Sequence, residues 1–200
     1  MLAAARAILA ALALAAIGWQ LMLQLGAAHS VLNFFSYFTN LSNLFAAAVL
    51  ALGALGWPAI GAVARDAARF ASAVNMAVVG IVFSVLLRNA DLGALLPWVN
   101  FVLHYLMPVA VVAEWLLQPP AARLNAKHLG LVLAFPIAYL AYVLLRGASI
   151  GWYPYPFLNP ANVGGYAGVA AYAAGIAATF ILTGWILLAL GNRRAMAKAN

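Results

Sequence analysis

Long apolar runs fill almost the whole chain, and short polar or Pro/Gly-rich breaks separate them. A transmembrane helix needs about 20 mainly apolar residues. The breaks delimit six stretches near that length, over residues 7–28, 34–55, 70–87, 96–117, 129–145 and 164–190. Membrane β-strands would instead alternate apolar and polar side chains over about ten residues. The pattern therefore predicts an all-α polytopic membrane protein with six transmembrane helices.

Composition supports that class. Of the 200 residues, 68% are hydrophobic and 6% are charged, whereas a soluble domain carries about 25% charged residues. No stretch is long enough to form a separate soluble domain, so we predict one transmembrane domain over residues 1–190 and a short basic cytoplasmic tail over 191–200. The apolar run near the N-terminus exceeds a signal-peptide core, and we expect the first span to be retained.

The ten Lys and Arg residues predict the orientation. Eight lie at the N-terminus, in the second and fourth loops or in the tail: Arg6, Arg65, Arg69, Arg123, Lys127, Arg193, Arg194 and Lys198. Under the positive-inside rule both termini are cytoplasmic, in the inner membrane if the source is bacterial. The net charge of +7 then meets anionic headgroups, and we expect no nucleic-acid partner.

Polar side chains inside the spans gather in the half of the membrane that this orientation places outside. They are Gln20 and Gln24 in the first span, Ser36, Thr39, Asn40 and Asn43 in the second, Ser84 and Arg88 in the third, and Asn100 and His104 in the fourth. Polar groups in hydrocarbon are costly unless they face the bundle interior. The pattern predicts a polar chamber open to the exterior; the alternative is that these groups only hydrogen-bond the helices together.

Thr39 and His104 are the candidate catalytic pair, because their estimated depths in the membrane differ by only ~5 Å. An imidazole that removes the proton of a threonine hydroxyl activates it as a nucleophile, and can later protonate the leaving group. The side-chain amides of Asn40, Asn43 and Asn100 are candidate donors to an oxyanion. Asn100 is alternatively the residue that orients His104.

Plainer interpretations remain for both residues. The Thr39 hydroxyl can bond back to the carbonyl of Phe35, as threonine often does in membrane helices, and His104 can be a neutral interhelical partner.

A zinc site needs about three converging ligands, and the external candidates His29, His104 and Asp91 are poorly spaced. Haem bound between membrane helices needs paired axial ligands, and His104 is the only histidine that the predicted spans place deep in the membrane. We therefore expect neither a metal nor a cofactor.

Other polar residues have two interpretations each. Arg88 lies at the outer mouth, where it can hold a lipid carboxylate or phosphate or simply extend to the interface. Gln20 and Gln24 are additional candidates for binding substrate in the chamber. The segment 151–160 contains three prolines and cannot be a regular helix. It is either an aromatic lid over the chamber or an interfacial belt.

Glu114 lies near the cytoplasmic end of its span, far from Thr39. A charge at that depth needs a partner. We expect Glu114 to pair with Arg123, Arg65 or Arg69.

Four short motifs carry a resemblance to a known family. They are FFSYFTNLSNL at residues 34–44, NFVLHYLMP at 100–108, EWLL at 114–117 and YPYPFL at 153–158. Their order and spacing resemble the bacterial branch of the androgen-induced, six-span integral membrane family, over most of the chain.

The animal members of that family are threonine hydrolases that cleave fatty acid esters of hydroxy fatty acids. The resemblance implies that Thr39, in Tyr-Phe-Thr, is the nucleophile and that His104, before Pro108, is the base. The polar residues 40–43 and the aromatic fifth loop depart from the animal pattern and leave the substrate open. We expect an intramembrane lipid-ester hydrolase acting on a membrane lipid or fatty acid ester; the alternative is a non-catalytic carrier of amphiphiles.

Overall fold

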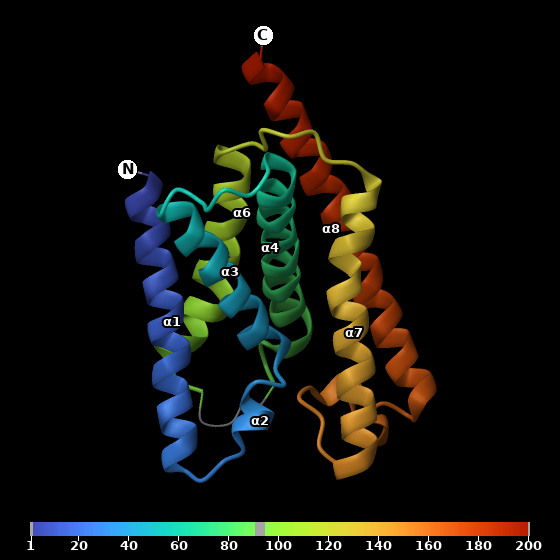
Figure 1. Cartoon of the computed structure of the whole chain (residues 1–200). Helices are drawn as coiled ribbons and strands as arrows, with labels where there is room; N and C mark the ends of the chain where they lie inside the picture. Colours follow the sequence, from blue (N-terminus) through green and yellow to red (C-terminus); the bar gives the residue numbers. More distant parts are fainter. Residues whose placement is uncertain (1, 91–94, 200) are drawn as a thin grey trace.

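The computed structural model describes residues 2–90 and 95–199, and Asp91 lies outside them. Every regular element in these two ranges is helical, with no strand, which confirms the all-α prediction. Figure 1 shows the helices arranged as one bundle. The α-helices are α1 (Leu2–Gly26), α2 (Val31–Phe34), α3 (Phe38–Ala54), α4 (Ala62–Val82), α5 (Pro97–Phe101), α6 (Met107–Leu117), α7 (Ala126–Ile150) and α8 (Tyr166–Ala199).

Five helical segments are long and apolar enough to cross a membrane, by length and composition. They are Leu2–Gly26, Ala62–Leu87, Pro97–Leu117, Ala126–Ile150 and Tyr166–Met196. α3 has 17 residues, so it is about 26 Å long at 1.5 Å per residue. It falls short of the roughly 30 Å hydrocarbon core.

The second predicted span is broken, so the expectation of one continuous helix over 34–55 is wrong at its first residues. α2 ends at Phe34, and α3 begins at Phe38 after an extended residue, Tyr37. At the break, two side chains donate the hydrogen bonds that helical N–H groups would otherwise donate to the backbone carbonyls. The two bonds run from Asn40 Nδ2 to the Phe34 carbonyl at 2.8 Å and from the Tyr139 phenol to the Ser36 carbonyl at 2.8 Å. Such satisfaction is required wherever backbone leaves the helix at membrane depth.

Two π-helical turns interrupt the helices beside this break. One, η1, covers Phe83–Leu87 at the end of α4, and the other, η2, covers Val102–Leu106 between α5 and α6. Pro108 follows η2 and has no N–H to close an α-helical bond onto the His104 carbonyl, which favours a wider turn. The turns bring the rings of Phe83 and His104 into a stack with centroids 4.0 Å apart.

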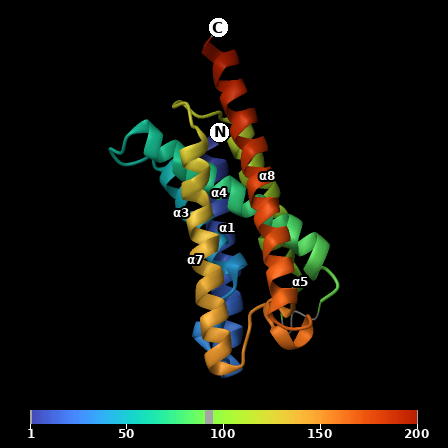
Figure 2. The ribbon, with the colours of Figure 1, turned by 90° about the vertical axis from the view of Figure 1, so that its right-hand side faces the viewer.

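The bundle has two distinct ends. Both termini and the loops that join α3 to α4 and α6 to α7 lie at one end, which we call the terminal end (Figure 1). The loops that follow α1 and α7 lie at the opposite, distal end. α4 contacts α3, α6 and α8, whereas α1 packs mainly on α3. In Figure 2, α7 and α8 face the viewer, inclined to each other.

A buried ion-pair network occupies the terminal end. Glu114 pairs with both Arg6 and Arg69, and Asp66 pairs with Arg69 at 3.3 Å. The prediction that Glu114 pairs with a basic residue is confirmed for Arg69; Arg6 was not anticipated. The network ties α1, α4 and α6 together, because its members come from these three helices. Removing one partner would leave a buried charge uncompensated.

Candidate active site

A polar cavity of about 320 Å³ is lined by residues of α1, of the loop after α1 and of the loop after α7, at the distal end of the bundle. Five of the predicted site residues line it: Gln20, Gln24, Thr39, Asn40 and His104. These side chains come from α1, α3 and the π turn η2. The structure therefore gathers around one space polar residues that lie up to 84 positions apart in the sequence.

Three other predicted site residues do not line this cavity. Arg88 is exposed at the end of the π turn η1. Asn43 is fully buried, and Asn100 precedes His104 by one turn, with its backbone carbonyl facing the imidazole.

Thr39 lies in the first turn of α3, because the helix starts one residue before it. Its backbone N–H has no partner within the helix and donates to the Tyr155 phenol oxygen at 3.3 Å. In the part of the chain that the structure describes, the Thr39 hydroxyl makes no bond back to the Phe35 carbonyl. A helix N-terminus carries partial positive charge, so developing negative charge at Thr39 lies in a favourable potential.

The His104 imidazole stacks on Phe83 and contacts one backbone carbonyl. Its Nδ1 lies 3.3 Å from the Asn100 carbonyl oxygen. A carbonyl only accepts hydrogen bonds, so Nδ1 carries the hydrogen and the neutral ring keeps its lone pair on Nε2. This contact agrees with the interpretation in which Asn100 orients His104, and it is made by the main chain of Asn100.

Asn43 links the backbone of Thr39 to that of Leu103, the residue before His104. Its Nδ2 donates to the Thr39 carbonyl at 2.9 Å and to the Leu103 carbonyl at 3.2 Å. A side-chain amide has two N–H hydrogens, so both are committed. Asn43 therefore fixes α3 against the turn that carries His104, a role that spacing alone did not indicate.

Thr39 and His104 share the cavity without a direct hydrogen bond in the described residues. Catalytic hydrogen bonds are often long in unliganded enzymes and tighten only when substrate is bound. The two side chains face one space in which a reacting group can lie between them.

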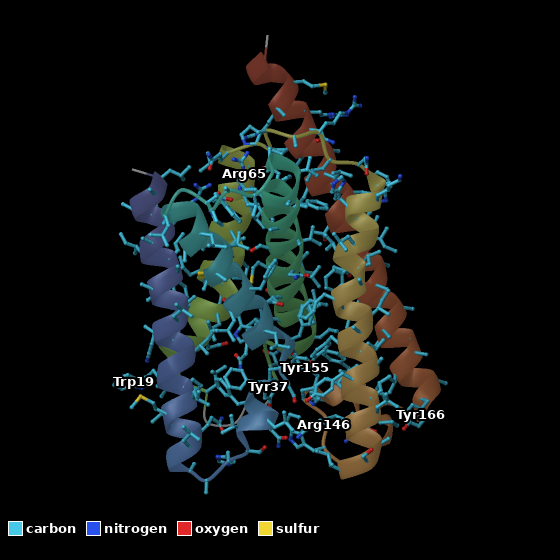
Figure 3. All side chains as sticks on the ribbon, in the orientation of Figure 1. Trp19, Tyr37, Arg65, Arg146, Tyr155 and Tyr166 are labelled. Atoms are coloured by element: carbon cyan, nitrogen blue, oxygen red, sulfur yellow. The ribbon has the colours of Figure 1, made fainter. Side chains whose placement is uncertain are left out.

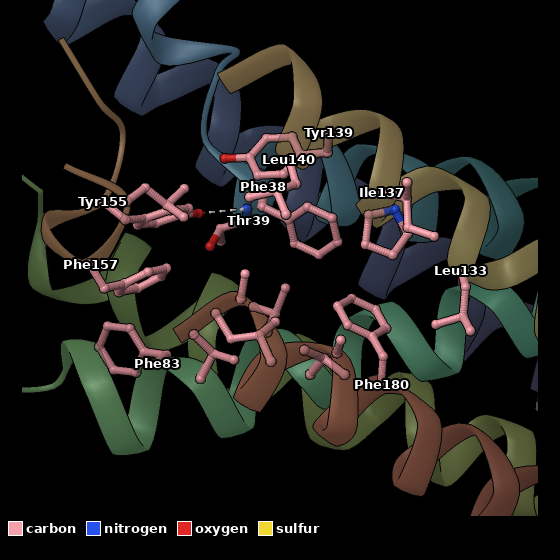
Figure 4. Close-up of a pocket in the computed structure, with 18 of the residues that line it drawn as sticks. Phe38, Thr39, Phe83, Leu133, Ile137, Tyr139, Leu140, Tyr155, Phe157 and Phe180 are labelled. Carbon is pink, nitrogen blue, oxygen red and sulfur yellow. Dashed lines mark hydrogen bonds between the residues drawn. The ribbon is translucent and has the colours of Figure 1, made fainter. Parts of the chain in front are cut away.

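A second, apolar cavity of about 270 Å³ adjoins Thr39. It lies between α3, α4, α7 and α8. Figure 4 shows Thr39 and Tyr155 near one end, with Leu133 and Phe180 toward the other. The sequence did not reveal this cavity, because its aliphatic and aromatic walls look the same in sequence as lipid-facing positions.

The segment between α7 and α8 folds over both cavities. Tyr155 and Phe157 are buried and stack with ring centroids 5.2 Å apart, and Trp152 lines the polar cavity. Arg146 lies 5.2 Å from the Trp152 ring and donates to Asn33 at 2.5 Å. Figure 3 places Tyr155 and Tyr37 together above Arg146. This geometry favours the lid interpretation over an interfacial belt.

No three His, Asp or Glu side chains of the described ranges gather where a metal ion would need them. The chemistry that this site can perform with its own groups is nucleophilic attack by a hydroxyl assisted by a neutral imidazole.

A family model described as FAR-17a/AIG1-like protein matches residues 71–188, more than half of the chain. No curated protein and no solved structure matches. The matched segment contains His104 and Tyr155, whereas Thr39 precedes it.

Proposed function

Because the chain belongs to the FAR-17a/AIG1-like protein family, we propose that it is an intramembrane lipid-ester hydrolase with Thr39 as nucleophile and His104 as general base. The observation that carries the proposal is the place of Thr39 at the junction of two cavities. One is polar and also lined by His104, and the other is apolar. An ester of a fatty acid has the same division, with an apolar chain on one side of its carbonyl and an alcohol on the other.

The reaction follows from that division. The acyl chain occupies the apolar cavity and the alcohol part occupies the polar one, so the ester carbonyl lies at Thr39. The Thr39 hydroxyl attacks the carbonyl carbon while His104 Nε2 takes its proton. His104 then returns that proton to the leaving alcohol, and an acyl-threonine remains. Water attacks this second ester by the same route and releases the fatty acid.

The proposed topology has six spans, with α2 and α3 together forming the second. Both termini lie in the cytoplasm, and the distal end with its polar cavity faces the exterior, in the inner membrane if the source is bacterial. One transmembrane domain covers residues 1–190, and the basic tail 191–200 follows it. The distribution of Lys and Arg supports this orientation.

The direct test is ester hydrolysis by the purified protein in lipid nanodiscs, with a fluorogenic long-chain fatty acid ester. We expect Thr39→Ala and His104→Ala to lose at least about 100-fold in kcat, the usual effect of losing a nucleophile or a general base. Thr179→Ala is the matched control, because this exposed threonine bonds its own helix at Gly175. Undiminished hydrolysis by both active-site variants would refute the proposal.

One observation favours a second candidate, a carrier that holds an amphiphile without cleaving it: Thr39 and His104 are not hydrogen-bonded to each other in the described structure. A carrier would copurify with a bound lipid and show no turnover. The same assay separates the two functions.

A further inference from the structure

We propose that the Tyr155 phenol is a further catalytic group, which donates a hydrogen bond to the oxyanion formed during ester cleavage. This inference rests on the proposed function. Among the described residues, only Thr39, Tyr155 and Leu87 line both cavities. Tyr155 is thus the one polar side chain that faces the junction beside the nucleophile itself.

The phenol has a hydrogen available for this role. Its oxygen accepts the backbone N–H of Thr39 at 3.3 Å, and a phenol that accepts in this way still has its O–H to donate. Because the phenol is bound to the backbone of Thr39, it stays beside the hydroxyl that attacks (Figure 4). A carbonyl in reach of that hydroxyl is also next to the phenol.

The amide side chains are less suited to the role. Both N–H hydrogens of Asn43 are committed to the carbonyls of Thr39 and Leu103. Asn40 Nδ2 donates to the Phe34 carbonyl, which holds the break before α3 in place. Turning either amide toward substrate would leave a buried carbonyl unpaired, at a cost of about 1–3 kcal/mol.

Tyr155 is also held rigidly, as a preorganised donor must be. Its ring stacks on Phe157 and meets Tyr37 edge-on, with centroids 5.2 and 5.7 Å apart. The residues on both sides of Tyr155 are prolines, Pro154 and Pro156, whose rings fix their own backbone φ angles. Burial raises the pKa of the Tyr155 phenol, and its hydrogen bonds with Thr39 offset only part of that rise. The phenol therefore keeps its hydrogen at neutral pH.

The step is balanced as follows. The Thr39 oxygen forms a bond to the carbonyl carbon, and the carbonyl π electrons move onto the carbonyl oxygen. His104 holds the threonine proton, while Tyr155 donates a hydrogen bond to the new oxyanion without transferring its proton. The carbonyl re-forms as the bond to the alcohol oxygen breaks, and His104 protonates that oxygen.

The test is Tyr155→Phe, which removes one oxygen and keeps the stacking ring. Loss of a single oxyanion donor typically lowers kcat by about 10²–10³, and we expect a fall of that size with KM near wild type. The thermal unfolding midpoint should also fall, because the Thr39 N–H loses its acceptor. Inhibition by an alkyl trifluoromethyl ketone, which forms a tetrahedral oxyanion on the nucleophile, should weaken in parallel. Tyr172→Phe is the matched control, because Tyr172 also stacks on Phe157 but lines neither cavity.

A kcat of Tyr155→Phe within about threefold of wild type, far from the loss expected for an oxyanion donor, would overturn the role of Tyr155. The hydrolase proposal would still stand in that case if the wild-type protein turned over the ester and Thr39→Ala did not. If Tyr155→Phe does not fold, 3,5-difluorotyrosine at position 155 replaces it, because that side chain keeps a more acidic O–H. The alkaline fall in activity should then begin at a lower pH than in wild type. An unchanged alkaline limb would count against the proposal.

Discussion

At the scale of single residues, the site depends on side chains that satisfy backbone groups as much as on those that react. Asn43 holds the Thr39 and Leu103 carbonyls, Asn40 holds that of Phe34, and the Asn100 carbonyl holds the imidazole of His104. Broken backbone at membrane depth needs such partners. We therefore propose a positioning role for the three asparagines that spacing suggested as oxyanion donors.

Asn43→Leu tests this positioning role. The substitution keeps the number and branching of the side-chain heavy atoms but removes both donated bonds. We therefore expect stability to fall by about 1–3 kcal/mol, and kcat to fall because α3 is no longer fixed against the turn bearing His104. Thermal unfolding and ester hydrolysis measure the two effects. Asn192→Leu removes a comparable tie to Leu124 at the terminal end, and should lower stability without lowering kcat. Equal kcat losses in both variants would contradict a specific role for Asn43.

The sequence singled out the candidate catalytic residues but not their surroundings. Polar side chains in apolar spans stand out, so Thr39, His104 and the glutamines of α1 could be identified from spacing alone. Tyr155 could not be paired with Thr39, because 116 residues separate them and a proline-rich aromatic segment is equally typical of an interfacial belt.

At the scale of elements, the interruptions define the site. A hydrophobic run predicts a span but does not show where the helical hydrogen bonds end. The break before Phe38 therefore could not be predicted from the run. That break moves Thr39 from the helix interior to the first turn, and the π turn at His104 lies beside it. Interruptions of both kinds are common at functional sites in membrane helices.

Gly147 tests how the loop after α7 is held. An added methyl group there would overlap the ring of Tyr153, whereas Gly130 on the same helix faces open space. We expect Gly147→Ala to displace the segment that carries Tyr155, to cost about 1–3 kcal/mol as overpacking does, and to lower kcat. Gly130→Ala should be neutral or stabilising by up to about 1 kcal/mol. Wild-type stability and turnover in Gly147→Ala would show that the loop position does not depend on this contact.

At the scale of the whole molecule, the two ends of the bundle differ in chemistry. The terminal end contains the charged groups Arg6, Asp66, Arg69 and Glu114, locked in ion pairs. At the distal end, the described residues that line the cavity include no Lys, Arg, Asp or Glu. The first arrangement joins α1, α4 and α6 through ion pairs, and the second leaves an open space between the helices.

The proposed orientation can be tested with single cysteines, because the chain contains none of its own. We expect Ser149→Cys, exposed near the distal end of α7, to react with a membrane-impermeant maleimide on intact cells. Gly61→Cys, exposed at the start of α4 at the terminal end, should react only after the cells are opened. The reverse pattern would invert the topology.

The central claim, that Thr39 forms a covalent acyl intermediate, is tested most directly by the intact mass of the protein after reaction with a lipid-like fluorophosphonate. We predict one adduct per chain on wild type, mapped by peptide analysis to Thr39. Thr39→Ala should gain no mass, His104→Ala should react much more slowly, and Thr179→Ala should react like wild type. An unmodified wild-type protein, or an adduct that persists in Thr39→Ala, would contradict the assignment of Thr39 as nucleophile.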